Sequence, residues 1–175
     1  MVGVGKAKRS SLARCSIVDY FGKILYDRFV KPHRKVTDYR TRWSGIVPEN
    51  LENAVPFEVA RSQIVKILRN KIVVGHALHF DMKILKLRLS KDRLRDTSTY
   101  EPLRRRAEMM DKPTPSLREL SKALLCRDIQ HPTHCSVEDS LAAMDLYRVV
   151  QEEWEKPQKS MYFHDSFWPD IEFLQ

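Results

Sequence analysis

The sequence predicts a single α/β domain with a mixed sheet, and three observations support this fold class. The length of 175 residues suits one hydrophobic core. Two neighbouring runs rich in β-branched and aromatic residues, 12–20 and 24–30, are typical of an antiparallel hairpin. Beyond residue 56, helix-type and strand-type apolar patterns alternate, which favours helices packed on a sheet.

The first element expected is the hairpin. Its strands, 12–20 and 24–30, are joined by a tight turn centred on Gly22. Pro32 ends the second strand because proline cannot donate a hydrogen bond to a neighbouring strand. Residues 31–54 are then expected to form a long basic loop.

A helix, a strand, a second helix and a second strand follow. Apolar residues recur at helical spacing over 56–70. Residues 71–75 form a short apolar run that ends in Gly75, which is typical of a buried strand. The next helix presents an apolar face over 78–89, and a further strand is expected over 93–100.

Two helices close the domain. Ser116 and Glu119 form a capping box at the start of the first. Residues 136–139 resemble a second cap, and the helix behind it reaches Trp154. The pattern changes at residue 157. We therefore expect a domain over residues 1–156 and a C-terminal tail over 157–175, whose aromatic residues show no helical period.

Charge and composition narrow the class of protein. The net charge is +8, and residues 1–42 carry all of it, with eleven Lys or Arg against three Asp. Such asymmetry favours either one basic face that binds a polyanion such as nucleic acid or a solvated basic surface. The three cysteines show no framework spacing, as in proteins of reducing compartments. No apolar run approaches the roughly 18 residues that span a membrane, so no membrane partner is expected.

One candidate site follows the buried strand 71–75. Asp81 falls in the opening turn of the next helix, and His76 lies directly after the strand. The carboxyl ends of strands in open α/β sheets are where such proteins bind ligands. The alternative is that Asp81 only complements the helix dipole.

A second candidate site lies at the start of the last helix. His134 sits in a loop, and Asp139 sits in the first helical turn. Asp139 could bind a metal while His134 takes a proton from water. The alternative is that Ser136 and Asp139 cap the helix and His134 is a loop residue.

A third candidate lies in the expected loop, where Arg40 and Arg42 alternate with Tyr39 and Trp43. Guanidinium groups bind phosphates, and a base could stack on an aromatic ring. The alternative is an ordinary loop with Trp43 buried and the arginines solvated.

A structural zinc site is the rival to these sites. Cys126, His131, His134 and Cys135 offer suitable atoms. Adjacent His and Cys ligands have unfavourable geometry, however, and a second pair of closely spaced cysteines is absent from the sequence.

Taken together, these segments resemble the DEDDh exonucleases of the RNase H-like superfamily, in the branch of the interferon-stimulated exonuclease, the apoptosis-enhancing nuclease and the Rex-type exonucleases. The resemblance covers residues 1 to about 155. It is carried by the segments 1–3 (MVG), 12–16 (LARCS), 38–45 (DYRTRWSG), 75–81 (GHALHFD), 96–98 (DTS) and 134–139 (HCSVED).

The resemblance implies an RNase H-like mixed sheet flanked by helices and a 3′→5′ exonuclease that acts on single-stranded RNA or DNA. In that scheme four carboxylates hold two divalent cations, Mg²⁺ or Mn²⁺. Asp81 and Asp139 are the second and fourth carboxylates, and His134 is the general base. Met1, Arg40 and His76 contact the substrate. A nuclear location, and more narrowly a nucleolar one, also follows from the resemblance alone.

The start of the sequence departs from the family pattern. Family members read Asp-x-Glu immediately before the Met-Val-Gly with which this sequence begins, and that motif supplies the first two metal ligands. We therefore expect the central first strand to be largely missing and the metal site to hold half its carboxylates. On this interpretation the chain is a truncated isoform, a fragment or a gene model with a wrong start. The alternative function is a catalytically inactive nucleic-acid-binding fragment.

Overall fold

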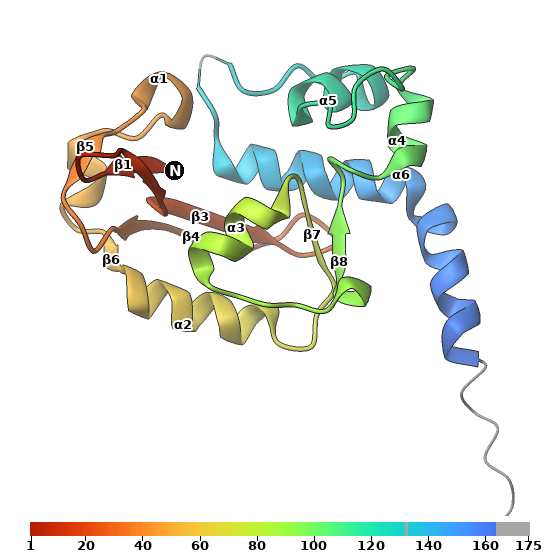
Figure 1. Ribbon diagram of the computed structural model, residues 1–175, viewed down its shortest axis with the longest axis horizontal. Coiled ribbons are helices and arrows are strands. Elements are labelled where there is room, and N and C mark those ends of the chain that lie inside the picture. The colour runs from red at the N-terminus through yellow and green to blue at the C-terminus, as the bar shows by residue number, and fades with distance from the viewer. Residues whose placement is uncertain (132, 164–175) are drawn as a thin grey trace, which may run out of the picture.

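The computed structural model describes residues 1–131 and 133–163, with side chains described as far as residue 156 (Figure 1). The elements follow one another along the chain as β1 (Val2–Val4), β2 (Arg9–Ser11), β3 (Arg14–Val18), β4 (Ile24–Lys31), β5 (Val36–Asp38), α1 (Thr41–Ser44), η1 (Pro48–Leu51), β6 (Val55–Pro56), α2 (Phe57–Leu68), β7 (Val73–Gly75), α3 (Leu78–Leu85), η2 (Lys91–Arg93), β8 (Leu94–Asp96), α4 (Glu101–Arg106), α5 (Leu117–Leu125) and α6 (Ser136–Phe163).

The strands of the described residues form three small sheets, ordered β2-β1-β5, β3-β4-β6 and β7-β8. β3 and β4 pair antiparallel, with Arg14 opposite Phe29, and form the hairpin that the sequence predicts. β4 pairs parallel with β6, and β7 pairs parallel with β8. The combination of antiparallel and parallel pairs, covered by helices, confirms the expected mixed α/β class.

The expectation of a featureless loop over residues 31–54 is wrong. β5, α1 and η1 lie in this segment, and β5 pairs with β1. β1 and β2 were also not anticipated. Each of the three strands holds only three residues, which is too short for an alternating pattern to stand out. Their pairing instead depends on partners elsewhere in the chain, which a local pattern does not reveal. The helix α4 was also not predicted, since its six residues are too few to show a helical period.

α6 is the element that joins the parts of the sheet. It packs against both β3 and β7, and Figure 1 shows it running across that side of the strands. Within the described residues β3 pairs with β4 and β7 with β8, and no strand connects β3 to β7. β1 holds Val2–Val4, the segment that the resemblance assigns to the end of the central strand.

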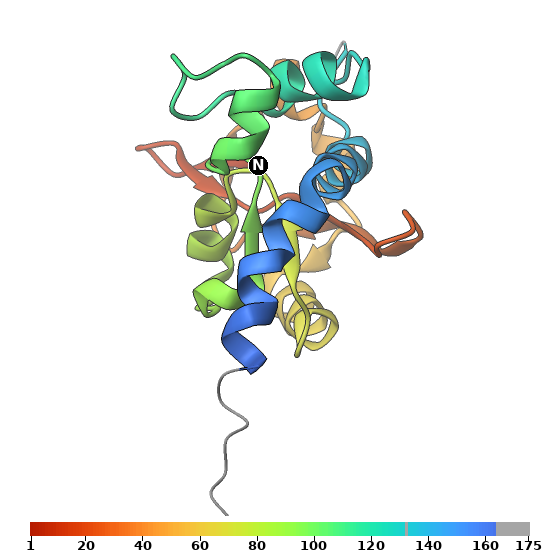
Figure 2. The same cartoon turned by 90° about the vertical axis from the view of Figure 1, so that its right-hand side faces the viewer.

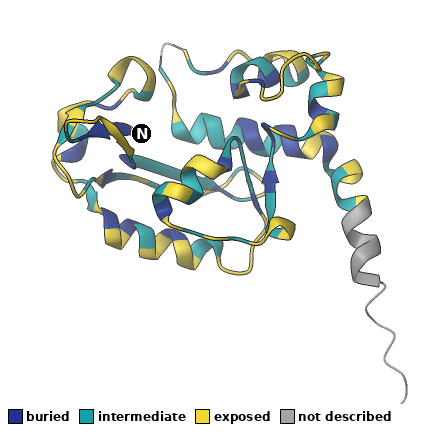
Figure 3. Ribbon diagram, in the orientation of Figure 1, coloured by how far each residue is buried: buried dark blue, intermediate teal, exposed yellow. Residues whose placement is uncertain are grey.

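Three clusters of buried side chains form the interior. Figure 3 marks along the ribbon which residues are buried. The first lies between α4, α5 and α6, with Leu103, Leu120 and Leu146 at its centre. The second packs α2 against β4. The third lies between β1 and the segment that holds α1 and η1, where Val2 meets Ile46. The last cluster anchors the start of β1 beside the loop that carries Arg40.

The last helix extends further than the sequence predicts. α6 continues through position 157, the expected boundary of the tail, to Phe163. The remainder of the expected tail, 164–175, with its aromatic residues, lies outside the described residues. None of the helices described here has the length and apolarity that crossing a membrane requires.

Candidate active site

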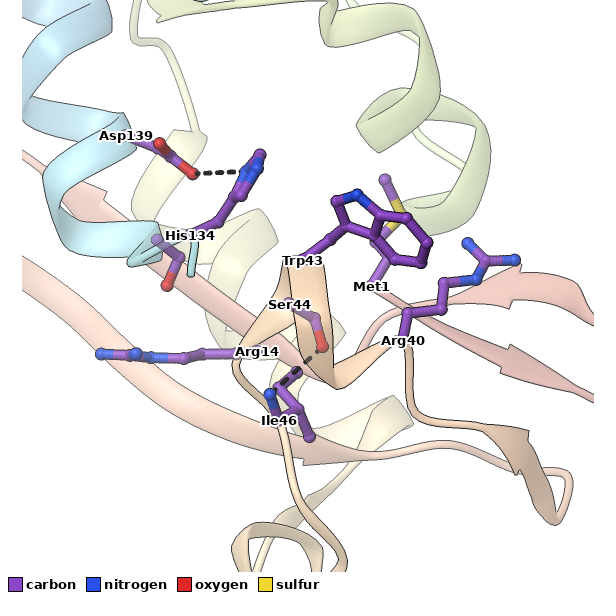
Figure 4. A pocket seen from close by; sticks show the side chains of 9 residues that line it. Met1, Arg14, Arg40, Trp43, Ser44, Ile46, His134 and Asp139 are labelled. Atoms are coloured by element: carbon purple, nitrogen blue, oxygen red, sulfur yellow. Dashed lines mark hydrogen bonds and ion pairs between the residues drawn. The ribbon is translucent and has the colours of Figure 1, made fainter. Parts of the chain in front are cut away.

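A pocket of about 440 Å³ brings together segments from distant parts of the chain (Figure 4). Its walls come from the start of β1, from β3, from α1 and from the beginning of α6. The residues that line it are Met1, Arg14, Arg40, Trp43, Ser44, Ile46, His134, Ser136 and Asp139. Four residues predicted from the sequence, Met1, Arg40, His134 and Asp139, therefore share one pocket.

Asp139 occupies the first turn of α6, as expected, and both of its carboxylate oxygens have neighbours. Gln130 Nε2 donates a hydrogen bond to Oδ1 over 2.8 Å, and His134 Nδ1 lies 3.7 Å from Oδ2. Burial raises the pKa of Asp139 above its usual range, whereas the Gln130 hydrogen bond and His134 act in the opposite direction. His134 is partly exposed and turns its ring toward Asp139 (Figure 4).

Asp81 lies in the opening turn of α3, which also confirms its expected position. Burial raises the pKa of this carboxyl as well. The backbone nitrogen of Met1 interacts electrostatically with both Asp81 and Asp139. Met1, directly before β1, therefore lies near both carboxylates, although Asp81 on α3 does not line the pocket.

The donor set agrees in part with a divalent-cation site. Two half-buried carboxylates supply the hard oxygen ligands that Mg²⁺ and Mn²⁺ prefer, and a nearby cation would favour their ionised forms against burial. Among the described residues, however, no group of three or more His, Cys, Asp or Glu side chains converges on one point. Asp81 and Asp139 can therefore contribute ligands, but they do not complete a site.

The same observation argues against structural zinc. The residues proposed for it, Cys126, His131, His134 and Cys135, do not form a cluster within the described chain. His131 instead contacts Asp128 at 3.3 Å and also Arg118. Cys126 ends α5 in a left-handed conformation and is exposed.

Asp96 positions the helix that carries Asp81. Its Oδ1 accepts a hydrogen bond from the backbone N–H of Ala77 at 2.9 Å, and its Oδ2 accepts from that of Leu78 at 2.8 Å. These two backbone N–H groups have no partner within α3 itself. Asp96, at the end of β8, therefore caps the start of this helix. Sequence reasoning missed this role because the cap lies far from the helix in the chain.

A second hydrogen-bond network fixes the start of α6. Ser16 Oγ on β3 donates to Asp27 Oδ1 over 2.8 Å and lies 2.6 Å from Ser136 Oγ. Arg14 donates to both oxygens of Asp27, each at 2.9 Å. Ser140 Oγ bonds the carbonyl of Ser16 as well. The hairpin β3–β4 therefore holds the helix turn on which Asp139 lies.

Arg40 connects the pocket to β2. The residue has a φ of 54° at the start of α1. Its Nη1 donates to Ser10 Oγ over 2.9 Å, and its Nη2 donates to the carbonyl of Lys8 over 2.8 Å. The guanidinium is thus held in place at the edge of the pocket, where a phosphate could be bound.

Trp43 lines the pocket and Arg42 lies beside it, and both residues are exposed to solvent. The Trp43 side chain is 61% exposed, so the alternative of a buried Trp43 is wrong. The Arg42 guanidinium lies 5.9 Å from the centre of the Trp43 ring, and Arg42 does not line the pocket. The backbone N–H of His134 donates to the carbonyl of Trp43 over 2.9 Å, which joins α1 to the loop before α6.

His76 lies at the end of β7, outside the pocket lining. Its Nδ1 is 3.0 Å from Thr97 Oγ1. Burial lowers the pKa of His76, which favours the neutral ring at neutral pH. His76 would therefore meet a substrate as a hydrogen-bonding group rather than as a cation.

Residues 1–147 match the family model for exonucleases of the RNase T type. The chain belongs to this exonuclease family. It is 53% identical over 159 residues to the interferon-stimulated 20 kDa exonuclease-like 2 of Homo sapiens, covering 89% of this chain and 45% of that protein. It is 41% identical over 191 residues to the apoptosis-enhancing nuclease of Homo sapiens, covering 97% of this chain and 59% of that one. The DEDDh branch expected from the sequence is thereby confirmed.

The chain spans about half the length of these relatives. Among solved structures, it superposes on the Pan2 pseudoubiquitin hydrolase-RNA exonuclease module of Saccharomyces cerevisiae in complex with A7 RNA with a TM-score of 0.74 and 27% identity, over 95% of this chain and 29% of that one. The Pan2 catalytic unit of Neurospora crassa gives a TM-score of 0.72 at 25% identity, over 91% of this chain and 27% of that one. The expected RNase H-like fold is confirmed.

Proposed function

We propose that this domain is the body of a 3′→5′ exonuclease that hydrolyses single-stranded nucleic acid with two divalent cations, Mg²⁺ or Mn²⁺. One observation carries the proposal: Asp139 and His134 line one pocket with Met1, whose α-amino group lies within electrostatic range of both Asp81 and Asp139, in a chain of the exonuclease family. Asp81 and Asp139 would hold the cations, which supply an activated water and neutralise charge on the phosphate undergoing attack.

The remaining residues act on the water and the substrate. His134 lies on the pocket side of Asp139 and would take a proton from the attacking water. Arg40, held by Ser10 and Lys8, would donate to a phosphate of the terminal nucleotides. Met1 would border the same nucleotide, Arg42 would add a cation near the pocket, and His76 would also contact the terminal nucleotides.

RNA is the substrate that we propose in preference to DNA. One relative, at 47% identity, is the RNA exonuclease 4 of Homo sapiens, and the Pan2 module has been solved in complex with RNA. Rates on RNA and DNA strands of matched sequence test this preference, and faster hydrolysis of the DNA strand would contradict it. A nuclear, and within it nucleolar, location is also proposed; imaging of the tagged protein tests it.

A second candidate function is nucleic-acid binding without hydrolysis. The observation in its favour is that fewer than three metal-binding side chains converge among the described residues. We therefore expect weak hydrolysis by these 175 residues alone and strong hydrolysis by a form in which Asp-x-Glu precedes Met1.

The test uses a 5′-labelled RNA strand with Mn²⁺, with both forms of the protein side by side. A 3′→5′ exonuclease produces a ladder of progressively shorter labelled strands. Asp139→Asn should reduce the rate by more than about 100-fold, because even groups that only orient a metal ligand contribute about 10- to 100-fold. Asp145→Asn is the matched control, since Asp145 lies on α6 but pairs with Arg127 and Arg148. Full activity of Asp139→Asn would refute the assignment.

A further inference from the structure

Several basic residues lie together around the hairpin formed by β1 and β2. Residues 1–42 carry the entire net charge of +8. Within this segment, Lys6, Lys8 and Arg9 lie on the hairpin formed by β1 and β2. Lys35 lies beside the hairpin turn, since its carbonyl accepts a hydrogen bond from the backbone N–H of Gly5 at 3.3 Å. These four residues are called the basic hairpin face below.

Most of this charge is not neutralised by the protein. All four side chains are exposed. Lys8 forms an ion pair with Asp38 at 3.3 Å. Lys6, Arg9 and Lys35 form none within the described part of the chain. By contrast, Arg105 and Arg106 on α4 form ion pairs with Glu101 and Glu153.

The basic hairpin face is continuous with the pocket. Arg40 lines the pocket, while its guanidinium bonds the carbonyl of Lys8 and the hydroxyl of Ser10. Met1, which lines the pocket, directly precedes β1, and β1 leads to the turn of the hairpin. Figure 2 shows this hairpin projecting from one side of the molecule, away from the β3–β4 turn. A strand leaving the pocket past Arg40 would therefore reach the basic hairpin face, where Lys6, Arg9 and Lys35 form no ion pair within the described residues.

The chemistry of the hairpin fits a phosphate backbone. Between Gly5 and Ser11 it carries cations and two serine hydroxyls, and its largest apolar side chain is that of Ala7. Lysine, arginine and serine are side chains that bind phosphate oxygens without reading sequence. An apolar protein partner or the interior of a membrane would require larger apolar groups.

We propose that the basic hairpin face binds the phosphates of a single-stranded nucleic acid upstream of the nucleotides held in the pocket. This inference rests on the proposed function, because that function places the 3′ end of the strand in the pocket. It adds a second binding surface that favours long strands over short ones and is insensitive to their sequence.

The proposal is tested by measuring how tightly the chain binds fluorescein-labelled oligouridylates of about 4 and about 20 nucleotides. EDTA is present so that the strands are bound without being hydrolysed. The double variant Lys6→Glu with Arg9→Glu should weaken binding of the long strand about 10-fold and leave that of the short strand within about 2-fold. The slope of log affinity against log salt for the long strand should fall by about 1.4, which corresponds to two phosphate contacts of a single strand.

The control variant is Lys66→Glu with Lys71→Glu, on α2 and the loop behind it. These exposed lysines form no ion pair within the described residues, and the double substitution changes the net charge by the same amount. Circular dichroism and thermal unfolding establish that both variants are folded. An equal loss in the control, or an equal loss for both strand lengths, would overturn the proposal.

Binding and hydrolysis are measured separately, so the two proposals can fail independently. A chain that binds long strands through the hairpin but hydrolyses none would contradict the exonuclease and support the binding surface. If the chain hydrolyses RNA but the Lys6→Glu with Arg9→Glu variant still binds the long strand as tightly relative to the short one, the exonuclease would be supported and the binding surface contradicted.

Discussion

Gln130 shows how a single residue can orient the candidate site. Its φ of 67° is left-handed, a conformation that costs a non-glycine residue about 1–3 kcal/mol. The neighbouring Ile129 is buried among α4, α5 and α6 and anchors the turn. The amide of Gln130 can then reach Asp139 Oδ1, and its backbone N–H reaches Glu138 Oε2 at 3.1 Å. The strained backbone thus aims two donors at the first turn of α6.

Replacing this amide should disturb the carboxylate that it holds. We expect Gln130→Glu to raise the Mn²⁺ concentration for half-maximal hydrolysis about 10- to 100-fold, since it substitutes a carboxylate for the donor to Asp139. The stabilisation of the protein by Mn²⁺ in thermal unfolding should decrease in parallel. Gln151→Glu is the control, because Gln151 accepts from Tyr20 on an exposed part of α6. Equal effects of the two substitutions would contradict the orienting role.

Among the helices, α5 has its start most fully specified by its own sequence. The Ser116 hydroxyl accepts from the backbone N–H of Glu119, and Glu119 returns a bond to the backbone N–H of Ser116 at 2.8 Å. Lys112 adds an ion pair to Glu119 at 2.5 Å. The Lys112 hydrogen bond, followed by the bonds from Ser116, lowers the pKa of Glu119 to about 2. The charged form of this residue therefore stabilises the folded state.

The stability of α5 should depend on pH through this carboxylate. Because the folded pKa lies below the unfolded one, the stabilisation is present above about pH 4.5 and is lost as the pH falls toward 2. Glu119→Gln should lower the free energy of unfolding by roughly 0.5–1 kcal/mol at pH 6, a small value because the ion pair is exposed. Urea titrations at pH 6 and pH 2.5 measure it. A difference as large at pH 2.5 as at pH 6 would exclude the charge as its cause.

At the scale of the whole molecule, a buried ion pair joins β8 to the second half of α6. Arg95 is 1% exposed, and its Nε and Nη2 donate to the two carboxylate oxygens of Glu155 at 2.6 and 2.9 Å. Tyr147 donates to the same carboxylate at 3.0 Å. α6 also packs on β3 and on α5, so this pair fixes one end of the helix that connects the parts of the fold.

Removing one partner of this pair should destabilise the entire domain. Glu155→Ala removes the carboxylate that accepts two hydrogen bonds from the buried Arg95, which we expect to lower the free energy of unfolding by about 3–5 kcal/mol. Glu152→Ala, at an exposed position of the same helix, should change it by less than about 0.5 kcal/mol. Thermal and urea unfolding compare the two variants. A loss below 1 kcal/mol for Glu155→Ala would show that the pair is not required.

Sequence patterns by themselves determined the elements whose signals are local. The hairpin β3–β4, the helices α2 and α3, and the cap of α5 were predicted close to their observed bounds. The positions of Asp81 and Asp139 in the first turns of their helices were predicted as well. These features depend on apolar periodicity and on capping residues within a few positions of each other.

The tertiary structure decided which of these residues meet. The sheet β2-β1-β5, the cap that Asp96 places on α3, the Ser16–Ser136 contact and the Gln130 bond to Asp139 all join distant segments. Each depends on hydrogen bonds between segments whose spacing in the chain carries no period. The sequence therefore identified the candidate catalytic residues, and the fold alone showed what holds them and where the unpaired positive charge lies.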